Sequence, residues 1–190
     1  MRIIGGRGRG RRLESPKGAT RPTGSRVRQT LFDILAPELP GSRFLDAFAG
    51  GGGVGLEALS RGAARVVLLE ESASAVAVAR RNAALLAAAG GEVRVFRQDA
   101  RVAVPALAAS GERFDIVFLD PPYASDLYEP LLGEIGSSGL LAPRGVVVAE
   151  HFHKRSLPET IGGLARVRSV RVGDHCLTFY RGPQEEERTS

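Results

Sequence analysis

The chain has 190 residues, of which 43% are hydrophobic and 25% are charged, as expected for one ordinary globular domain. No apolar run approaches the ~18–20 residues that span a bilayer, and the first residues lack the apolar stretch of a signal peptide. The single cysteine, Cys176, excludes an internal disulfide and a zinc site built from several cysteines. These features predict a soluble, cytoplasmic protein.

The net charge of +5 is unevenly distributed along the chain. Residues 1–28 hold nine Lys or Arg and one acid, Glu14, whereas the rest carries 17 basic and 20 acidic side chains. Genome composition explains why Arg is chosen over Lys, but it does not explain their concentration at one end. A basic arm on a mildly acidic body is typical of a protein with a phosphate-rich partner. The candidate nucleic-acid contacts are Arg7, Arg9, Arg11, Arg12, Arg21 and Arg26.

The first elements in chain order belong to this basic arm. Residues 2–13 fit a short hairpin with glycine turns, and 17–23 fit a loop. Ser25 is expected to cap a helix over 26–36. We expect an arm over 1–24, a body over 25–182 and a disordered polar tail over 183–190.

From residue 43, expected strands alternate with expected helices. The strands cover 44–45, 66–69, 93–96, 114–119 and 146–149. The helices cover 53–61, 74–89, 101–110 and 126–136. This alternation indicates an α/β protein with a parallel sheet between two layers of helices.

The last two expected strands, 167–172 and 175–180, are joined through Gly173-Asp174. That turn is too short for a helical crossover, so these strands must pair antiparallel. The prediction is a Rossmann-like, mostly parallel seven-stranded sheet closed by an antiparallel C-terminal hairpin. This is the outline of the class I S-adenosylmethionine-dependent methyltransferase fold.

A glycine-rich loop follows the first strand of the body. Gly50, Gly52 and Gly55 satisfy G-x-G-x-x-G between a strand and a helix, although a flexible turn could produce the same pattern. Glu70 ends the second strand 20 residues after Gly50, where an acid binds the ribose hydroxyls of an adenosine ligand. Glu71 is the alternative if the strand runs one residue further.

Two further acids bear on the ligand. Asp46 directly precedes the loop, where a carboxylate suits the ammonium and sulfonium of S-adenosylmethionine but repels the pyrophosphate of NAD. A helix-capping or turn-stabilising role for Asp46 is the alternative. Asp99 and Ala100 end the third strand at the same sheet edge, where they could contact an adenine ring. An N-cap role for Asp99 remains open.

The candidate catalytic residues are Asp120, Pro121, Pro122 and Tyr123, at the end of the fourth strand. Consecutive prolines fix the backbone and direct its carbonyls outward. An exocyclic base amine is a poor nucleophile, and the Asp120 carboxylate and Pro121 carbonyl can accept its two N–H bonds and orient its nitrogen. Tyr123 offers a face on which the base can stack. Elsewhere in a chain this tetrapeptide would indicate a rigid loop, but its register with Glu70 and the glycine loop favours catalysis.

Longer motifs extend this pattern across residues 1–181. They are Met1–Gly6 with Gly10–Leu13, Arg21–Thr23 with Arg26–Arg28 and Thr30–Phe32, Gly55–Ala63, and Phe118–Tyr123. In these motifs the chain resembles the bacterial methyltransferase D family, whose members methylate guanine N2 in 16S rRNA. It departs from that family at Gly51, Gln29 and Asp33, where Ser, Glu and Asn are usual. The first departure could loosen the cofactor loop, and none removes a catalytic group.

The resemblance implies transfer of a methyl group from S-adenosylmethionine to the N2 amine of one guanine in 16S rRNA, within a partly assembled small ribosomal subunit. It also places Arg21 and Thr23 near the cofactor and the base entrance. We expect a monomer that needs no metal.

Three other functions fit parts of the sequence. A DNA adenine-N6 or cytosine-N4 methyltransferase could use the same tetrapeptide, but such enzymes usually carry a target-recognition insertion that is missing here. An NAD-type oxidoreductase would use the glycine loop, but Asp46 counts against it. A non-catalytic RNA-binding module would explain only the arm. His151 and His153 could suggest a metal site, but we expect surface or loop histidines there, and we expect Cys176 to be a small packing residue.

Overall fold

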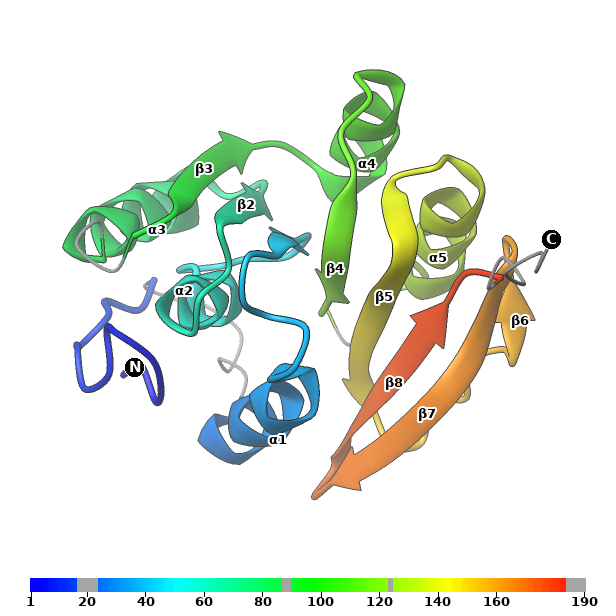
Figure 1. Cartoon of the computed structure of the whole chain (residues 1–190), viewed down its shortest axis with the longest axis horizontal. Helices are drawn as coiled ribbons and strands as arrows, with labels where there is room; N and C mark the ends of the chain where they lie inside the picture. Colours follow the sequence, from blue (N-terminus) through cyan, green and yellow to red (C-terminus); the bar gives the residue numbers. More distant parts are fainter. Residues whose placement is uncertain (17–23, 87–89, 123–124, 184–190) are drawn as a thin grey trace, which may run out of the picture.

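One mixed sheet of eight strands organises the computed structural model, which describes residues 1–16, 24–86, 90–122 and 125–183 (Figure 1). Its strand order is β3-β2-β1-β4-β5-β8-β7-β6. The strands are β1 (Arg43–Asp46), β2 (Arg65–Glu70), β3 (Glu92–Arg97), β4 (Phe114–Leu119), β5 (Leu141–Phe152), β6 (Thr160–Ile161), β7 (Leu164–Val172) and β8 (His175–Arg181). The helices are α1 (Ser25–Leu35), α2 (Gly53–Ser60), α3 (Ala73–Leu85), α4 (Ala100–Ala109) and α5 (Tyr128–Ser137).

The first five strands run parallel, as the alternating pattern predicts. β1 pairs with β2 on one side and with β4 on the other, so the strand order reverses at β1. Open α/β sheets bind ligands outside the carboxyl ends of their strands at such a switch point. The segments after β1 and β4 therefore flank one crevice.

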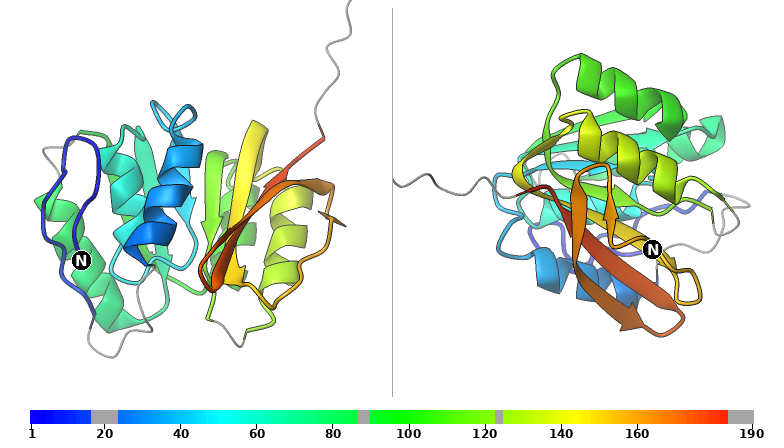
Figure 2. Two further views of the ribbon diagram at one scale, coloured as in Figure 1. Left: turned by 90° about the horizontal axis from the view of Figure 1, so that it is seen from below. Right: turned by 90° about the vertical axis from the view of Figure 1, so that its right-hand side faces the viewer.

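Two separate apolar cores hold the layers together. Side chains from the arm, α1, α2 and α3 pack on one face of the sheet, and side chains from α4 and α5 pack on the other. Figure 2 shows the sheet between these two helical layers. The inner strands are buried on both faces, which explains the continuous apolar runs of β2 and β4.

The C-terminal strands pair antiparallel, as predicted, with β8 lying between β5 and β7. The sheet has eight strands rather than the expected seven because β6, of only two residues, pairs with the start of β7. No periodicity can reveal so short a strand. The expected capping role of Ser25 is wrong, because Ser25 is the first residue of α1 and Gly24 precedes it without a side-chain cap.

The arm folds as a narrow hairpin that lies against α2 and α3 (Figure 1). Arg2 and Arg12 form its antiparallel bridge, and Ile3 and Leu13 are buried in the core beneath it. Glu57 of α2, fully buried, accepts hydrogen bonds from the N–H groups of Ile4 and Gly5, both at 2.8 Å. A buried carboxylate thus holds the arm by its backbone.

The two edges of the sheet differ. The edge strand β3 is largely exposed and carries Glu92, Arg94 and Arg97. The other edge strand, β6, has only two residues. None of the helices in the described part of the chain is long and apolar enough to cross a membrane. The predicted tail over 183–190 lies, beyond Pro183, outside the described residues.

Candidate active site

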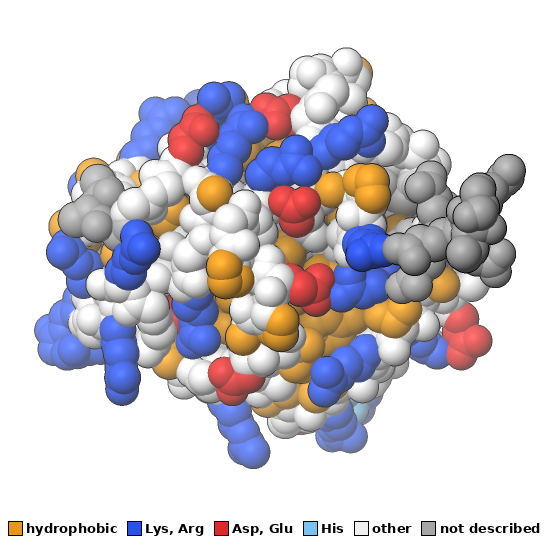
Figure 3. All heavy atoms as spheres, in the orientation of Figure 1, with side chains coloured by type: hydrophobic (Ala, Val, Ile, Leu, Met, Phe, Trp, Pro, Cys, Tyr) orange, Lys and Arg blue, Asp and Glu red, His pale blue; other side chains and the backbone are white. Residues whose placement is uncertain are grey.

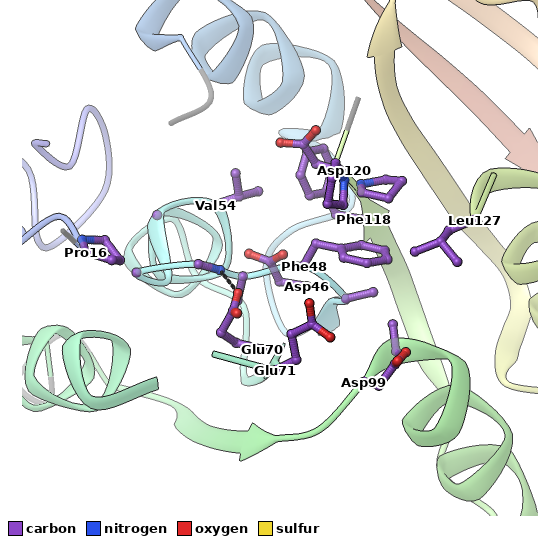
Figure 4. Close-up of a pocket in the computed structure, with 18 of the residues that line it drawn as sticks. Pro16, Asp46, Phe48, Val54, Glu70, Glu71, Asp99, Phe118, Asp120 and Leu127 are labelled. Atoms are coloured by element: carbon purple, nitrogen blue, oxygen red, sulfur yellow. Dashed lines mark hydrogen bonds between the residues drawn. The ribbon is translucent and has the colours of Figure 1, made fainter. Parts of the chain in front are cut away.

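A cavity of about 480 Å³ opens at the carboxyl ends of β1, β2, β3 and β4 (Figure 4). This volume is in the range of cavities that hold cofactors and other small molecules, roughly 300–1,000 Å³. Residues of the glycine loop, the ends of β2 and β3, and Asp120-Pro121-Pro122 all line it. The predicted cofactor and catalytic motifs therefore share one space.

The glycine loop turns sharply from β1 into α2. Gly50 and Gly52 have positive φ angles of 53° and 86°, which side chains disfavour. Gly55 is needed for a different reason: a Cβ atom there would lie 2.3 Å from Leu68 Cδ2 of β2. The three glycines thus allow the turn and bring α2 close to the sheet.

Glu70 at the end of β2 braces this loop. Its Oε2 accepts the Gly50 N–H at 2.9 Å (Figure 4), and its Oε1 accepts the Ser72 N–H at 2.8 Å. Each carboxylate oxygen has a second lone pair, so Glu70 can still accept hydrogen bonds from a ligand. Glu71 also lines the cavity and is exposed.

Asp46 lies at the base of the cavity and is 1% exposed. Its Oδ2 accepts the Gly55 N–H at 3.0 Å, and its Oδ1 is buried without a hydrogen-bond partner among the described residues. Burial raises the pKa of Asp46 to about 7; the Gly55 N–H opposes this rise, and the charges of Asp120 and Glu70 add to it. The Gly55 contact confirms the loop-stabilising alternative, while the unpartnered oxygen leaves Asp46 able to bind a cation.

Asp99 and Ala100 lie where β3 passes into α4, on the cavity wall. Asp99 caps α4 by accepting the Arg101 N–H at 2.8 Å, so the N-cap alternative is confirmed. The Arg101 guanidinium also pairs with the Asp99 carboxylate and lowers the pKa of Asp99. Arg101 itself lines the cavity, which the sequence pattern did not indicate.

The end of β4 carries Asp120, whose carboxylate points toward the α1 side of the cavity (Figure 4). Pro121 is buried and Pro122 exposed, and both line the same space. Three predicted site residues lie outside the described residues: Tyr123, Thr23 and Arg21.

Acidic side chains dominate the lining. Among the described residues it contains seven acids, Glu14, Asp46, Glu70, Glu71, Asp99, Asp120 and Asp126, and two arginines, Arg28 and Arg101. Such a lining repels a polyphosphate and favours a cationic ligand. This agrees with the interpretation of Asp46 from the sequence.

Several lining residues were missed by sequence reasoning. Phe48 lies between Asp46 and Leu127 in the cavity, and the Asp-Ala-Phe-Ala-Gly run at the loop could have signalled an aromatic wall (Figure 4). Met1, Glu14, Ser15 and Pro16 bring the arm itself to the rim. No sequence pattern links the arm to the glycine loop, because this contact depends on how the arm folds back.

Of the arginines predicted to contact RNA, the five that the structure describes are exposed on the arm and on α1. Arg7, Arg9, Arg11 and Arg12 all have exposed side chains, and Arg26 is exposed at the start of α1. Arg11 also donates to the Leu85 carbonyl at 2.6 Å, which ties the arm to α3. Basic side chains gather over the arm at the left of Figure 3.

The expectation of a surface or loop position is wrong for His151. It is 4% exposed within β5, and its Nε2 lies 2.8 Å from Thr178 Oγ1. Burial lowers the pKa of His151, so the neutral ring is favoured in the core. Among the described residues, no cluster of three or more His, Cys, Asp or Glu could hold a metal ion.

Comparisons with known proteins agree with this arrangement. The model of the family described as Conserved hypothetical protein 95 matches residues 1–181. Ribosomal RNA small subunit methyltransferase D of Escherichia coli K12 is 40% identical over 188 residues, which cover 98% of this chain and 92% of the relative.

Solved structures extend the likeness to the fold. A hypothetical protein of Thermus thermophilus superposes with a TM-score of 0.80 at 39% identity, covering 94% of this chain and 98% of the other. An RNA methyltransferase of Salinibacter ruber in complex with S-adenosyl-L-homocysteine superposes with a TM-score of 0.64 at 18% identity, covering 90% and 99%. The sheet and helices thus form the fold of S-adenosylmethionine-dependent methyltransferases.

Proposed function

Because this chain belongs to the family of Conserved hypothetical protein 95, we propose that it methylates the exocyclic N2 amine of a guanine in 16S rRNA, with S-adenosylmethionine as the methyl donor. The observation that carries the proposal is that Asp120 and Pro121 open into the same cavity as the glycine loop, Asp46 and Glu70. The residues suited to bind an amine therefore lie in the same cavity as the residues suited to bind a cationic cofactor.

The cavity divides naturally along its length. Glu70 or Glu71 accepts from the ribose hydroxyls, and Asp99 and Ala100 border the adenine. The ionised Asp46 attracts the positive charges of the methionine moiety. Gly50, Gly52 and Gly55 let the cofactor approach the backbone, and the family resemblance assigns Thr23 to the same cofactor.

The bound cofactor supplies an electrophilic methyl group on a cationic sulfur. The Asp120 carboxylate and the Pro121 carbonyl accept hydrogen bonds from the two N–H groups of the guanine amine. They hold its nitrogen in line with the methyl group of the cofactor. As the nitrogen takes the methyl group and positive charge develops on it, the Asp120 carboxylate would stabilise that charge and accept the proton that the nitrogen loses, with S-adenosylhomocysteine as the leaving group. Pro122 keeps this backbone rigid, and Tyr123 stacks on the base.

The exposed arginines of the arm, together with Arg21 and Arg26, bind the RNA phosphates. We propose that a monomer acts in the cytoplasm on an assembling small ribosomal subunit, whose structure supplies specificity that so small an enzyme lacks.

Transfer of tritium from labelled S-adenosylmethionine to 30S particles, naked 16S rRNA and DNA tests this proposal. Nuclease digestion and mass spectrometry of the labelled product should yield N2-methylguanosine. Adenine-N6 or cytosine-N4 methylation of DNA would support the rival methyltransferase, and RNA binding without transfer would support a non-catalytic module.

A further inference from the structure

Arg28 is a buried cation, and the described residues satisfy only part of its hydrogen-bonding capacity. It lies on α1, is 2% exposed and lines the cavity. Its Nη2 donates to the Arg2 carbonyl of the arm at 2.7 Å. Its Nε and Nη1 are buried and make no hydrogen bond with the described residues. Buried charged donors are normally satisfied, so this exception needs a physical reason.

Glu57 cannot provide that reason. Its Oε2 lies 3.9 Å from Arg28 Nε, beyond hydrogen-bonding distance. Both Glu57 oxygens are engaged by the N–H groups of Ile4 and Gly5, and Oε1 also accepts Arg61 Nε at 2.8 Å. Glu57 therefore balances the charge of Arg28 at a distance while its lone pairs serve the arm.

The unused donor lies over the start of α2. A Cβ atom built on Gly53, the first residue of that helix, would be 3.6 Å from Arg28 Nη1. First-turn N–H groups of a helix have no partner within the helix and attract anions. A guanidinium N–H and these N–H groups thus face the same part of an otherwise acidic cavity.

Asp46 contacts the same turn two residues further along, where its Oδ2 accepts the Gly55 N–H. A guanidinium with two N–H-bearing nitrogens that lack hydrogen-bond partners and a carboxylate with one such oxygen are therefore both held at the first turn of α2 among the described residues. Both residues line the cavity, and their opposite charges match those of a zwitterion such as an α-amino acid, whose ammonium would bind Asp46 and whose carboxylate would bind Arg28.

We infer that Arg28 binds the carboxylate of the methionine moiety of the cofactor, with the arm holding the guanidinium in place through the Arg2 carbonyl. The inference rests on the proposed function, because it assigns one end of the cofactor to one residue. A carboxylate at Arg28 satisfies buried donors and neutralises a buried charge, so its binding is strongly favoured.

Isothermal titration calorimetry with S-adenosylmethionine and its decarboxylated analogue, without RNA, tests the inference. The wild-type protein should prefer S-adenosylmethionine by about 10- to 100-fold, the range for a buried charge-assisted hydrogen bond. Arg28→Met should lose most of that preference by binding S-adenosylmethionine more weakly, while its Kd for the decarboxylated analogue stays within about twofold. Arg80→Met, an exposed substitution on α3, should keep the wild-type preference.

The ratio of the two Kd values is internal to each variant, so general damage to the cavity does not change it. Arg28→Lys keeps the charge without the fork of donors and should retain an intermediate preference; it serves as the test if Arg28→Met does not fold. Equal affinities in the wild-type protein, or equal weakening of both ligands in Arg28→Met, would overturn the assignment. If the wild-type protein bound neither ligand, both the assignment of Arg28 and the proposed function would be overturned. If it showed the expected ratio of Kd values but did not methylate rRNA, only the proposed rRNA substrate would be overturned.

Discussion

The N–H of Gly55 donates to Asp46 Oδ2 at 3.0 Å, and this contact joins the first turn of α2 to the end of β1. This hydrogen bond offsets part of the cost of burying an ionised Asp46. Burial is the larger effect and raises the pKa of the carboxyl to about 7, in a cavity suited to a cation.

Cofactor binding should therefore depend on pH. The ammonium of S-adenosylhomocysteine should stabilise the ionised form of Asp46, whose pKa is about 7 in the free protein. Below that pH the ligand must displace a proton, so affinity for S-adenosylhomocysteine should rise by up to about tenfold per pH unit between pH 5.5 and 7 and then level off. Calorimetry in buffers of different ionisation enthalpy should detect the released proton. A Kd that does not change between pH 5.5 and 7.5 would contradict this role.

Asp46→Asn should show the opposite effects on stability and binding. The unfolded carboxyl ionises near 3.8 and the folded one near 7, so the wild-type free energy of unfolding falls as pH rises between these values. Asn does not titrate, so the variant keeps this stability. The difference in the free energy of unfolding, variant minus wild type, should be larger at pH 8 than at pH 5 by on the order of 2 kcal/mol. Thermal unfolding of the ligand-free protein at both pH values measures the difference. The same variant should bind S-adenosylhomocysteine weakly, and an equal shift at both pH values would show that Asp46 does not titrate there.

Asp120→Asn and Asp120→Ala should separate chemistry from cofactor binding. Loss of one preorganised acceptor at a developing charge typically reduces kcat by about 10²–10³-fold. Because the proposed role of Asp120 is to accept hydrogen bonds from the base amine and not from the cofactor, the Kd for S-adenosylhomocysteine should change little. Single-turnover methylation and calorimetry measure the two quantities. Equal losses in both would place Asp120 in the cofactor site instead.

The arm should contribute an electrostatic share of RNA affinity. Replacing Arg7, Arg9, Arg11 and Arg12 with Gln removes four exposed cations. The slope of log Kobs against log salt should become shallower, by about 0.7–0.9 for each lost phosphate contact. Filter binding of 16S rRNA fragments at several salt concentrations tests this, with Arg113→Gln as a control on the far end of β4. An unchanged slope would exclude the arm as the RNA contact.

Asn82 should link the arm to the glycine loop. Its buried side-chain amide donates to the carbonyls of Glu14 and Gly51, at 3.0 and 2.8 Å, and its Oδ1 accepts the Glu14 N–H at 2.8 Å. Asn82→Asp removes both donors, so the Kd for S-adenosylhomocysteine should rise by about tenfold, consistent with one or two lost hydrogen bonds. Hydrogen exchange at residues 1–16 should accelerate in the same variant. Wild-type affinity together with fast exchange would show that the arm is not a wall of the cofactor site.

Much of this site was predictable because parallel strands place their carboxyl ends at one edge of a sheet. Once the alternation of strands and helices is recognised, Asp46, Glu70, Asp99 and Asp120 must come near one another. Their residue types and the intervening glycines then indicate the chemistry. The cavity brings all of them together.

Other features were not predictable because they depend on backbone groups or on tertiary contacts. The arm is held on Glu57 by the N–H groups of Ile4 and Gly5, and any residue except proline could supply those donors. Arg28 lies in a basic segment and resembles a surface cation until α1 packs against α2. The burial of His151 likewise follows from β8 lying beside β5, a pairing of strands about 25 residues apart in sequence.

The two sheet edges bear on how this protein behaves when concentrated. An unpaired strand invites the same strand of another molecule, and charged or very short edge strands discourage that pairing. β3 carries Glu92, Arg94 and Arg97, and β6 offers only two residues, so neither edge is a good template for a ninth strand from a second copy. These edges matter for a protein with a basic arm, because several molecules bound close together on one RNA would not associate through their sheet edges.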